Sequence, residues 1–163
     1  MRSHLHHMLD QFPKVSGHRS LPKAWFTTDP RCVNPIETAK HLPLACGVII
    51  RHYEDPNRGS IISAIMADAR KSGRTVLIGG SSELAKYHEA SGVHWPQRAN
   101  VEPLAAPLLS IHAVHNDAEL IDAEKSGADA IIISPIFPTQ SHPGQKTLGV
   151  EGLETLLRKT HVP

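Results

Sequence analysis

The sequence lacks the features that mark several large classes of protein. Its 163 residues carry a formal net charge of +1, without a basic patch or a long acidic run. This balance gives no support for nucleic acid or an anionic membrane as a partner. The longest apolar runs, such as 47–50 and 130–133, are far too short to span a bilayer. No apolar stretch typical of a signal peptide occurs near Met1, so we expect a cytoplasmic location.

Cysteine is also scarce, whereas histidine is abundant. Cys32 and Cys46 are the only cysteines, and their spacing fits neither a metal site nor a redox motif, so we predict free thiols in a reducing compartment. Four of the twelve histidines fall within the first 18 residues, and a surface metal site over residues 4–7 is one interpretation. We favour a polar N-terminal extension over residues 1–22, because no carboxylate or cysteine cluster completes a site.

Short apolar segments alternate with helical patterns from residue 23 onward. Asn34 followed by Pro35 is typical of a helix start, and Asn116 followed by Glu119 is close to a capping box. Because the βα order repeats six times with short connections, the sequence predicts a parallel α/β fold, either a barrel or an open sheet. The predicted strands are 25–28, 47–51, 75–78, 92–95, 108–111 and 130–133, and helices are predicted after Asn34 and Asn116 and over 61–69, 83–90 and 150–159.

The segment from Gly127 to Gly152 carries the strongest functional signal. Its apolar run 130–133 predicts a strand buried on both faces, as in a parallel sheet. The run leads into a long polar loop that contains Pro135, Pro138 and Pro143. Ligands of α/β barrels bind where loops leave the carboxyl ends of the strands. We therefore expect a ligand site at this loop.

This segment resembles the signature loop of thiamine phosphate synthases, in which a strand ends in Gly-Pro-Ile-Phe-Pro-Thr; here Ser134 replaces the glycine. Residues 25–29 are similar to the family's first-strand Leu-Val-Thr-Asp, residues 91–95 to its Ala-Asp-Gly-Val-His-Leu, and residues 114–116 to its Ser-Thr-His-Asn. By their order and spacing, the chain is identified as a divergent member of the thiamine phosphate synthase and thiazole tautomerase superfamily. The resemblance implies an α/β fold of the TIM-barrel (β/α)8 type, with about six βα units present in this chain.

The resemblance also sets the expected domain, a thiamine phosphate synthase-like βα barrel over residues 23–163. Residues 160–163 resemble the start of the family's seventh strand, and six βα units do not close an eight-stranded barrel. We therefore expect a C-terminally incomplete barrel; a partner that covers the gap and an open sheet are the alternatives. The first and sixth strands of an incomplete barrel would expose their edges, so a homo-oligomer is a further expectation.

Thiamine phosphate synthases join an aminopyrimidine pyrophosphate to a thiazole phosphate, and this step needs Mg²⁺ and cationic side chains to neutralise the leaving pyrophosphate. By resemblance, Gly80 and Ala99 stand where the family has its two metal-binding aspartates, Gly79 stands at a pyrophosphate-binding asparagine, and Tyr53 stands at a lysine. We therefore assign no metal ligand, although Mg²⁺ is expected for the family. Arg51 keeps the family's arginine, which can clamp a phosphate with two hydrogen bonds.

Two loops are candidates for binding a phosphorylated small molecule. After the third predicted strand, backbone N–H groups and hydroxyls can hold an anion; the alternative is a tight turn with Ser82 capping the helix. In the loop after residue 133, the resemblance assigns hydroxyls to the thiazole phosphate; the alternative is a set of turn-forming residues and an exposed histidine. Arg51 can also face a carboxylate such as Glu54 or Asp55 instead of an anion. The candidate substrate-binding residues are Arg51, Gly79, Gly80, Ser81, Thr139, Gln140, Ser141 and His142.

His115 is the candidate general acid or base, because it stands in a loop that leads into a helix N-terminus. A hydrogen-bonded structural role is the alternative for it and for His94 and His112.

Three functions remain open from the sequence. The first is a thiamine phosphate synthase-type transferase with a degenerate metal and pyrophosphate site. The others are a non-catalytic binder of a thiazole phosphate or another phosphorylated heterocycle, and an isomerase like the thiazole tautomerases. The loss of both metal carboxylates argues for one of the latter two.

Overall fold

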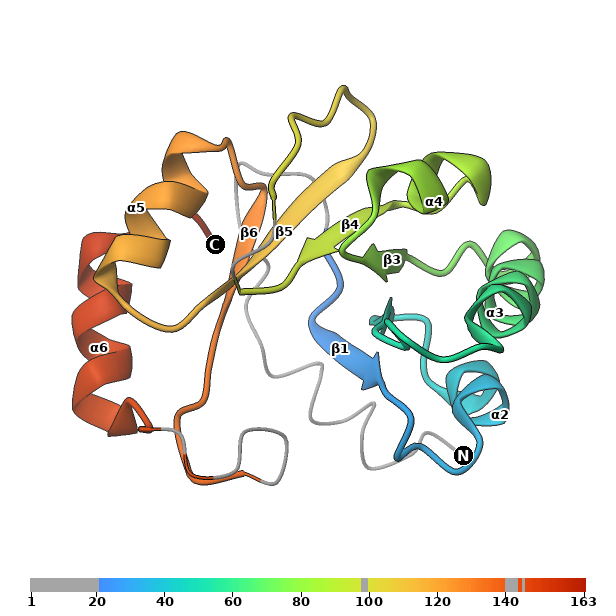
Figure 1. Cartoon of the computed structure of the whole chain (residues 1–163), viewed down its shortest axis with the longest axis horizontal. Coiled ribbons are helices and arrows are strands. Elements are labelled where there is room, and N and C mark those ends of the chain that lie inside the picture. Colours follow the sequence, from blue (N-terminus) through green and yellow to red (C-terminus); the bar gives the residue numbers. More distant parts are fainter. Residues whose placement is uncertain (1–20, 98–99, 140–143, 145) are drawn as a thin grey trace.

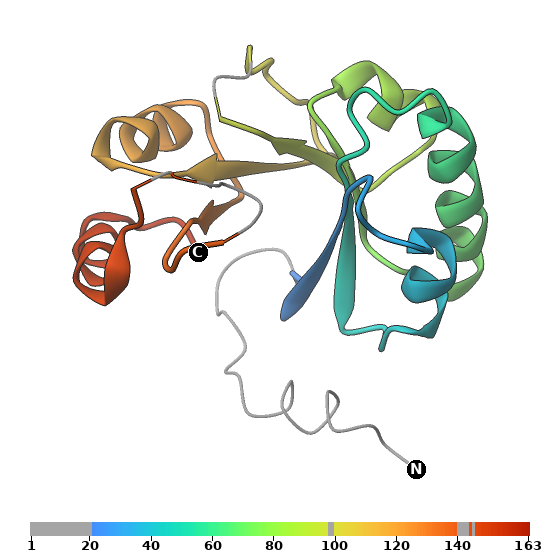
Figure 2. The same cartoon turned by 60° about the horizontal axis from the view of Figure 1, so that its bottom comes forward.

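Six parallel strands form one sheet, in the same order as they occur along the chain. The computed structural model describes residues 21–97, 100–139, 144 and 146–163. The strand order contains no reversal, unlike that of a doubly wound sheet, and is the order of an α/β barrel. The sheet curls into a half-barrel (Figures 1 and 2), which confirms the predicted barrel-type fold. The strands are β1 (Ala24–Thr28), β2 (Cys46–Ile50), β3 (Val76–Gly79), β4 (Gly92–Trp95), β5 (Leu109–Val114) and β6 (Ala130–Ile133).

The helices lie outside the curl in two groups. Figure 2 shows one group over each half of the sheet. In the residues described between β4 and β5, the chain forms no helix. The first group is α2 (Pro35–His41), α3 (Arg58–Ser72) and α4 (Ser82–Tyr87); the second is α5 (Asp117–Lys125) and α6 (Gly149–Lys159).

Side chains that cap the backbone explain where the helices begin. Asn34 accepts a hydrogen bond from the Glu37 N–H at 3.3 Å, and Asn116 accepts one from the Glu119 N–H at 3.0 Å, so both predicted starts are confirmed. The α4 start differs from the expectation that Ser82 caps it. Ser81 Oγ accepts the Leu84 N–H at 3.1 Å and is the cap, because Ser82 is already inside the helix and its hydroxyl bonds to Glu102.

Alternation along the strands gives the sheet two apolar faces. Val48 and Ile50 point outward into a core with α2, α3 and α4, whereas Ile49 points into the curl. The inner cluster of Ile49, Leu77, Leu109, Ile111 and Ala130 is also contacted by Leu21, Trp25 and Ile132. Burial on both faces is the reason why these strands appear in the sequence as continuous apolar runs.

The fifth strand is longer than predicted. It extends over Leu109–Val114, not 108–111, so His112 lies within the strand and is 5% exposed. Polar contacts make this burial possible: Ser110 Oγ accepts the Trp95 Nε1–H at 3.1 Å and lies 2.9 Å from His112 Nε2. The sequence prediction ended the strand at Ile111 because the next residue, His112, interrupts the apolar pattern.

The sheet has β1 and β6 at its two edges. The residues that follow α6 return to β6, where the Ile131 N–H donates to the Pro163 carbonyl at 2.9 Å. Cys32 is partly buried and Cys46 is buried, and both are free thiols as predicted. Within the described ranges, no helix has the length and apolar character needed to cross a membrane.

Candidate functional site

Three residues meet on the inner face of the sheet where the strands end. Arg51 directly follows β2 and comes two positions after the inward-facing Ile49. Gly79 ends β3 two positions after the inward-facing Leu77, and the register of β3 and β4 places His94 opposite Gly79. Because alternate residues of a strand share a face, Arg51, Gly79 and His94 form one inner-face group at the carboxyl ends.

Arg51 supplies positive charge that is only partly compensated. Its Nη2 lies 3.7 Å from Asp29 Oδ2, and its side chain is 27% exposed. Asp29 is bound more closely by Arg31, at 2.6 Å, and this hydrogen bond is the main reason why the pKa of Asp29 falls to about 2. The carboxylate that faces Arg51 therefore comes from the end of β1, and not from the expected Glu54 or Asp55. Arg51 Nε is buried and has no hydrogen-bond partner among the described residues.

His94 is the site residue that the candidate binding set omitted. It is 5% exposed, and its Nδ1 is buried without a hydrogen-bond partner in the described structure. Burial lowers the pKa of His94 to about 4, and the charge of Arg51 adds to the effect, so the imidazole is neutral at pH 7. Its place in the motif 91–95, combined with the two-residue period of a strand, was the signal that could have identified it.

The loop after β3 is a tight turn whose groups already have internal partners. Gly80 has a positive φ of 69° and donates its N–H to the His94 carbonyl at 2.8 Å. The Gly79 carbonyl accepts from Arg58 Nη2 at 2.6 Å. The Ser81 hydroxyl accepts from the helix backbone but keeps its own proton to donate. Of the three candidate residues in this turn, Ser81 therefore offers an anion the clearest remaining donor.

The loop after β6 carries the other candidates. Thr139 is exposed at the end of the described part of this loop, whereas Gln140, Ser141 and His142 lie outside the described residues. Two backbone bonds close the base of the loop: Leu148 N–H donates to the Pro135 carbonyl and Gly149 N–H donates to the Ile136 carbonyl. Thr139 follows β6, and Arg51 follows β2. Because the strands are parallel, both residues come after the carboxyl ends of their strands.

His115 lies apart from this group. Its Nδ1–H donates to Glu119 Oε2 at 2.7 Å, and the same carboxylate accepts from the His115 backbone at 2.8 Å and from Gln97 at 2.7 Å. Burial raises the pKa of Glu119, but the hydrogen bonds from His115 and Gln97 outweigh it and lower the pKa overall. His115 borders a groove of about 440 Å³ between the starts of α5 and α6, whose lining also includes Asn116, Lys146 and Thr155 and excludes the inner-face group.

The described residues do not fit a bound Mg²⁺. No group of three or more histidine, cysteine or carboxylate side chains is placed to hold a metal in the described part of the chain. Asp29, near Arg51, is engaged by two arginines, and Gly80 has no side chain to coordinate with. Ala99, the second position where the family has a metal-binding aspartate, lies outside the described residues.

Comparison with known proteins agrees with this fold and with the motifs. The sequence model of the family described as "Thiamine monophosphate synthase" matches residues 44–163. The chain is 32% identical over 120 residues to "Putative thiamine-phosphate synthase 2" of Aquifex aeolicus, covering 69% of this chain and 63% of that protein. It is 30% identical over 118 residues to the "Thiamine-phosphate synthase" of Lactococcus lactis subsp. lactis, covering 68% and 55%. The chain thus spans between about half and just under two thirds of these relatives.

A solved structure shows the same fold. "Thiamine phosphate pyrophosphorylase from Pyrococcus furiosus" superposes with a TM-score of 0.70 at 21% identity, covering 86% of this chain and 71% of that one. At this identity the likeness concerns the fold alone. The sequence match over residues 44–163, the ordered half-barrel and the motifs at the strand ends lead to one conclusion. The chain belongs to the thiamine monophosphate synthase family.

Proposed function

We propose that this chain binds a phosphorylated thiazole-type heterocycle at the carboxyl ends of its strands, as a thiamine phosphate synthase-type protein of thiamine biosynthesis. The observation that carries the proposal is the guanidinium of Arg51, which lies on the inner face with a buried Nε that lacks a partner in the described structure. An arginine in this condition is stabilised by an anion, and its planar fork matches two phosphate oxygens.

The neighbours of Arg51 suit the rest of such a ligand. His94 offers a neutral, buried ring nitrogen that can hydrogen-bond to a heterocycle next to the bound phosphate. The core below these residues is apolar and fully buried, with Ile49, Leu77 and Ile111, and it holds the strand ends that carry the polar group in place. By resemblance, Thr139 and residues 140–142 would add donors to the phosphate.

Joining this heterocycle to an aminopyrimidine pyrophosphate is the reaction that the names of the relatives suggest. That reaction needs the charge of a leaving pyrophosphate to be neutralised, and metal carboxylates normally contribute to this. The described residues supply arginines and no metal site. The proposed role is therefore metal-independent ligand binding, and the joining reaction is expected to be absent or very slow when both substrates and Mg²⁺ are supplied.

A second candidate function is isomerisation of the bound thiazole phosphate. One observation favours it: His94 has a buried ring nitrogen without a partner in the described structure, beside the proposed ligand, where it can exchange a proton with the heterocycle without a metal. Proton exchange into the heterocycle, followed by NMR in heavy water, distinguishes an isomerase from a binder. Exchange that is lost in His94→Gln supports the isomerase.

The binding proposal is tested by calorimetric titration with thiazole phosphate. Arg51→Ala is expected to weaken binding by about ten- to a hundred-fold, because a hydrogen bond to a charged group contributes about 1.5–3 kcal/mol. The control, Arg70→Ala, removes an arginine of α3 that is 51% exposed and bonds only at the surface, so it should leave the affinity unchanged. Adding Mg²⁺ should not change the affinity of either variant or of the parent for thiazole phosphate. Equal affinities of the parent and Arg51→Ala would show that Arg51 is structural and that the site assignment fails.

A further inference from the structure

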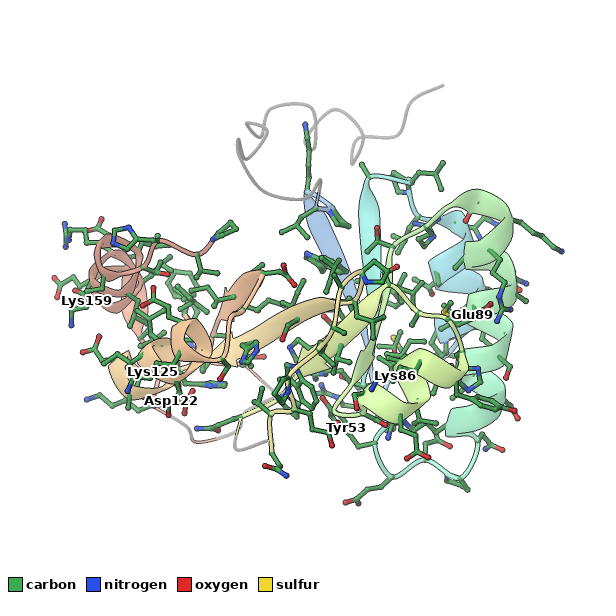
Figure 3. The ribbon with its side chains drawn as sticks, turned by 90° about the horizontal axis from the view of Figure 1, so that it is seen from above. Tyr53, Lys86, Glu89, Asp122, Lys125 and Lys159 are labelled. Carbon is green, nitrogen blue, oxygen red and sulfur yellow. The ribbon has the colours of Figure 1, made fainter. Side chains whose placement is uncertain are left out.

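Tyr53 lies directly on the two glycines at the end of β3. A Cβ atom on Gly79 would come within 2.9 Å of both Cε1 and Oη of Tyr53, and one on Gly80 would come within 3.3 Å of Cε1. Tyr53 thus fills the volume that a longer side chain at these positions would need. Figure 3 labels Tyr53 on the side of the sheet where the strands end, between α4 with Lys86 and α5 with Asp122.

Arg58, the first residue of α3, holds Tyr53 in this place. Its Nη2 donates to the Gly79 carbonyl at 2.6 Å, and its Nη1 donates to the Tyr53 carbonyl at 3.4 Å. Its Cζ also lies 5.6 Å from the centroid of the Tyr53 ring, within the range of a cation–π contact. Arg58 therefore connects the Tyr53 loop to the end of β3 through both the backbone and the ring.

The positive charge around Tyr53 is poorly balanced. No carboxylate of the described residues lies within 4.0 Å of Arg58, and Arg58 Nε is buried without a partner there. Arg51 shares its one carboxylate, that of Asp29, with Arg31. Burial raises the pKa of Tyr53, while the two arginines oppose this effect, so the phenol keeps its proton at pH 7 and can donate it. A hydroxyl donor beside two arginines is a suitable partner for an anion.

We propose that Tyr53 determines the ligand specificity of this site. Its ring excludes a divalent cation with a bound diphosphate from the end of β3, and its hydroxyl donates to a single phosphate group that Arg51 holds. The site then takes a phosphate monoester of a heterocycle without metal. The part about the monophosphate rests on the proposed function, whereas the exclusion depends only on Tyr53, Arg58 and the two glycines.

The residues at positions 53, 79 and 80 depend on one another, because the ring of Tyr53 needs the space that glycine leaves open at the other two positions. By resemblance, Tyr53 stands at a lysine of the family, and Gly79 and Gly80 stand at an asparagine and an aspartate. The structure shows why these changes belong together: the ring occupies the space that the two lost side chains would fill. Restoring one polar side chain at residue 79 or 80 would therefore not restore a metal site while the ring is present.

Titration calorimetry with two probes tests the specificity. For inorganic pyrophosphate with Mg²⁺, Tyr53→Ala is expected to bind at least ten-fold more tightly than the parent, because the opened space lies beside Arg51 and Arg58. The matched control Tyr53→Phe keeps the ring and should stay at the level of the parent. For thiazole phosphate, Tyr53→Phe should bind about two- to ten-fold more weakly, the effect of losing one hydrogen bond.

A measurement without ligand checks the steric part. Gly79→Ala places a Cβ against both Tyr53 and the Ile50 carbonyl in the parent, but only against the Ile50 carbonyl when Tyr53 is alanine. The loss of melting temperature caused by Gly79→Ala should therefore be smaller in the Tyr53→Ala background. Equal losses in both backgrounds would show that the ring is not the obstacle and would overturn the exclusion.

The outcomes separate this inference from the proposed function. If pyrophosphate with Mg²⁺ binds equally to the parent and to Tyr53→Ala, the exclusion by the ring is wrong. If the parent binds no thiazole phosphate while Tyr53→Ala gains pyrophosphate binding, the proposed function fails and the role of the ring remains. If Tyr53→Phe binds thiazole phosphate as tightly as the parent, the hydroxyl is not a donor to the ligand.

Discussion

Acid should destabilise this protein through His94, because the folded state keeps that imidazole neutral. Burial lowers the pKa of His94 from its ordinary value of 6.5 to about 4, and the residue is 5% exposed, so folding opposes its protonation. The unfolded chain binds a proton below about pH 6.5, which makes stability rise with pH across the interval from 4 to 6.5. The contribution of His94 is therefore complete above pH 6.5 and is lost as the pH falls toward 4.

The magnitude follows from the size of this shift. A difference of about 2.5 pKa units corresponds to about 3 kcal/mol over the whole interval, and about 2 kcal/mol of this is lost by pH 5. This is a large share of the stability of a typical domain, which is roughly 5–15 kcal/mol.

Urea unfolding of the parent and of His94→Gln at pH 7.5 and pH 5 measures this contribution. The parent should lose about 2 kcal/mol more than His94→Gln between the two pH values, because glutamine does not titrate. His161→Gln is the control: it removes an exposed histidine, and so accounts for the change in the number of histidines. If the parent and His94→Gln lose the same stability on acidification, the desolvation argument for His94 is refuted.

Two further predictions concern single elements of the fold. Arg74 is 6% exposed and donates to the carbonyls of Leu42, Pro43 and Cys46 at 2.8–2.9 Å, so Arg74→Met should lower the free energy of unfolding by about 3 kcal/mol, since it leaves buried acceptors unpaired. A loss below about 1 kcal/mol in urea unfolding would contradict this role. Asn116→Ala removes the cap of α5 and should cost about 1 kcal/mol, with Asn116→Asp as the control that keeps an acceptor; equal stability of both variants would refute the capping role.

Local sequence patterns predicted most of the elements. The strands 92–95 and 130–133 were predicted with the correct bounds, and the predicted start of α6 was one residue too late. These segments carry their own signals, namely apolar runs between turn residues and a helical period. The fifth strand was cut short before His112, because the burial of this residue depends on its contact with Ser110, which in turn is bonded by Trp95 of β4.

The candidate site was predicted less completely. The sequence assigned Arg51 to a strand end, and the structure places it on the inner face at that end. The roles of Thr139, Gln140, Ser141 and His142 in ligand binding stay predictions. The pairing of Arg51 with Asp29 joins residues 22 positions apart, and no local pattern reveals it. His94 was weighed between a catalytic and a structural role and was left out of the binding set, since the lack of a partner for its buried nitrogen becomes visible only in the described structure.

By itself, the sequence determined the alternation of strands and helices, the caps at Asn34 and Asn116, and the family to which the chain belongs. These depend on periods, caps and motifs that involve residues close together in the chain. Only the tertiary structure decided which side of each strand faces the curl, which carboxylate faces Arg51, and that Tyr53 covers Gly79 and Gly80. Such contacts join residues from different βα units, so they exist only after the sheet has curled and its register is fixed.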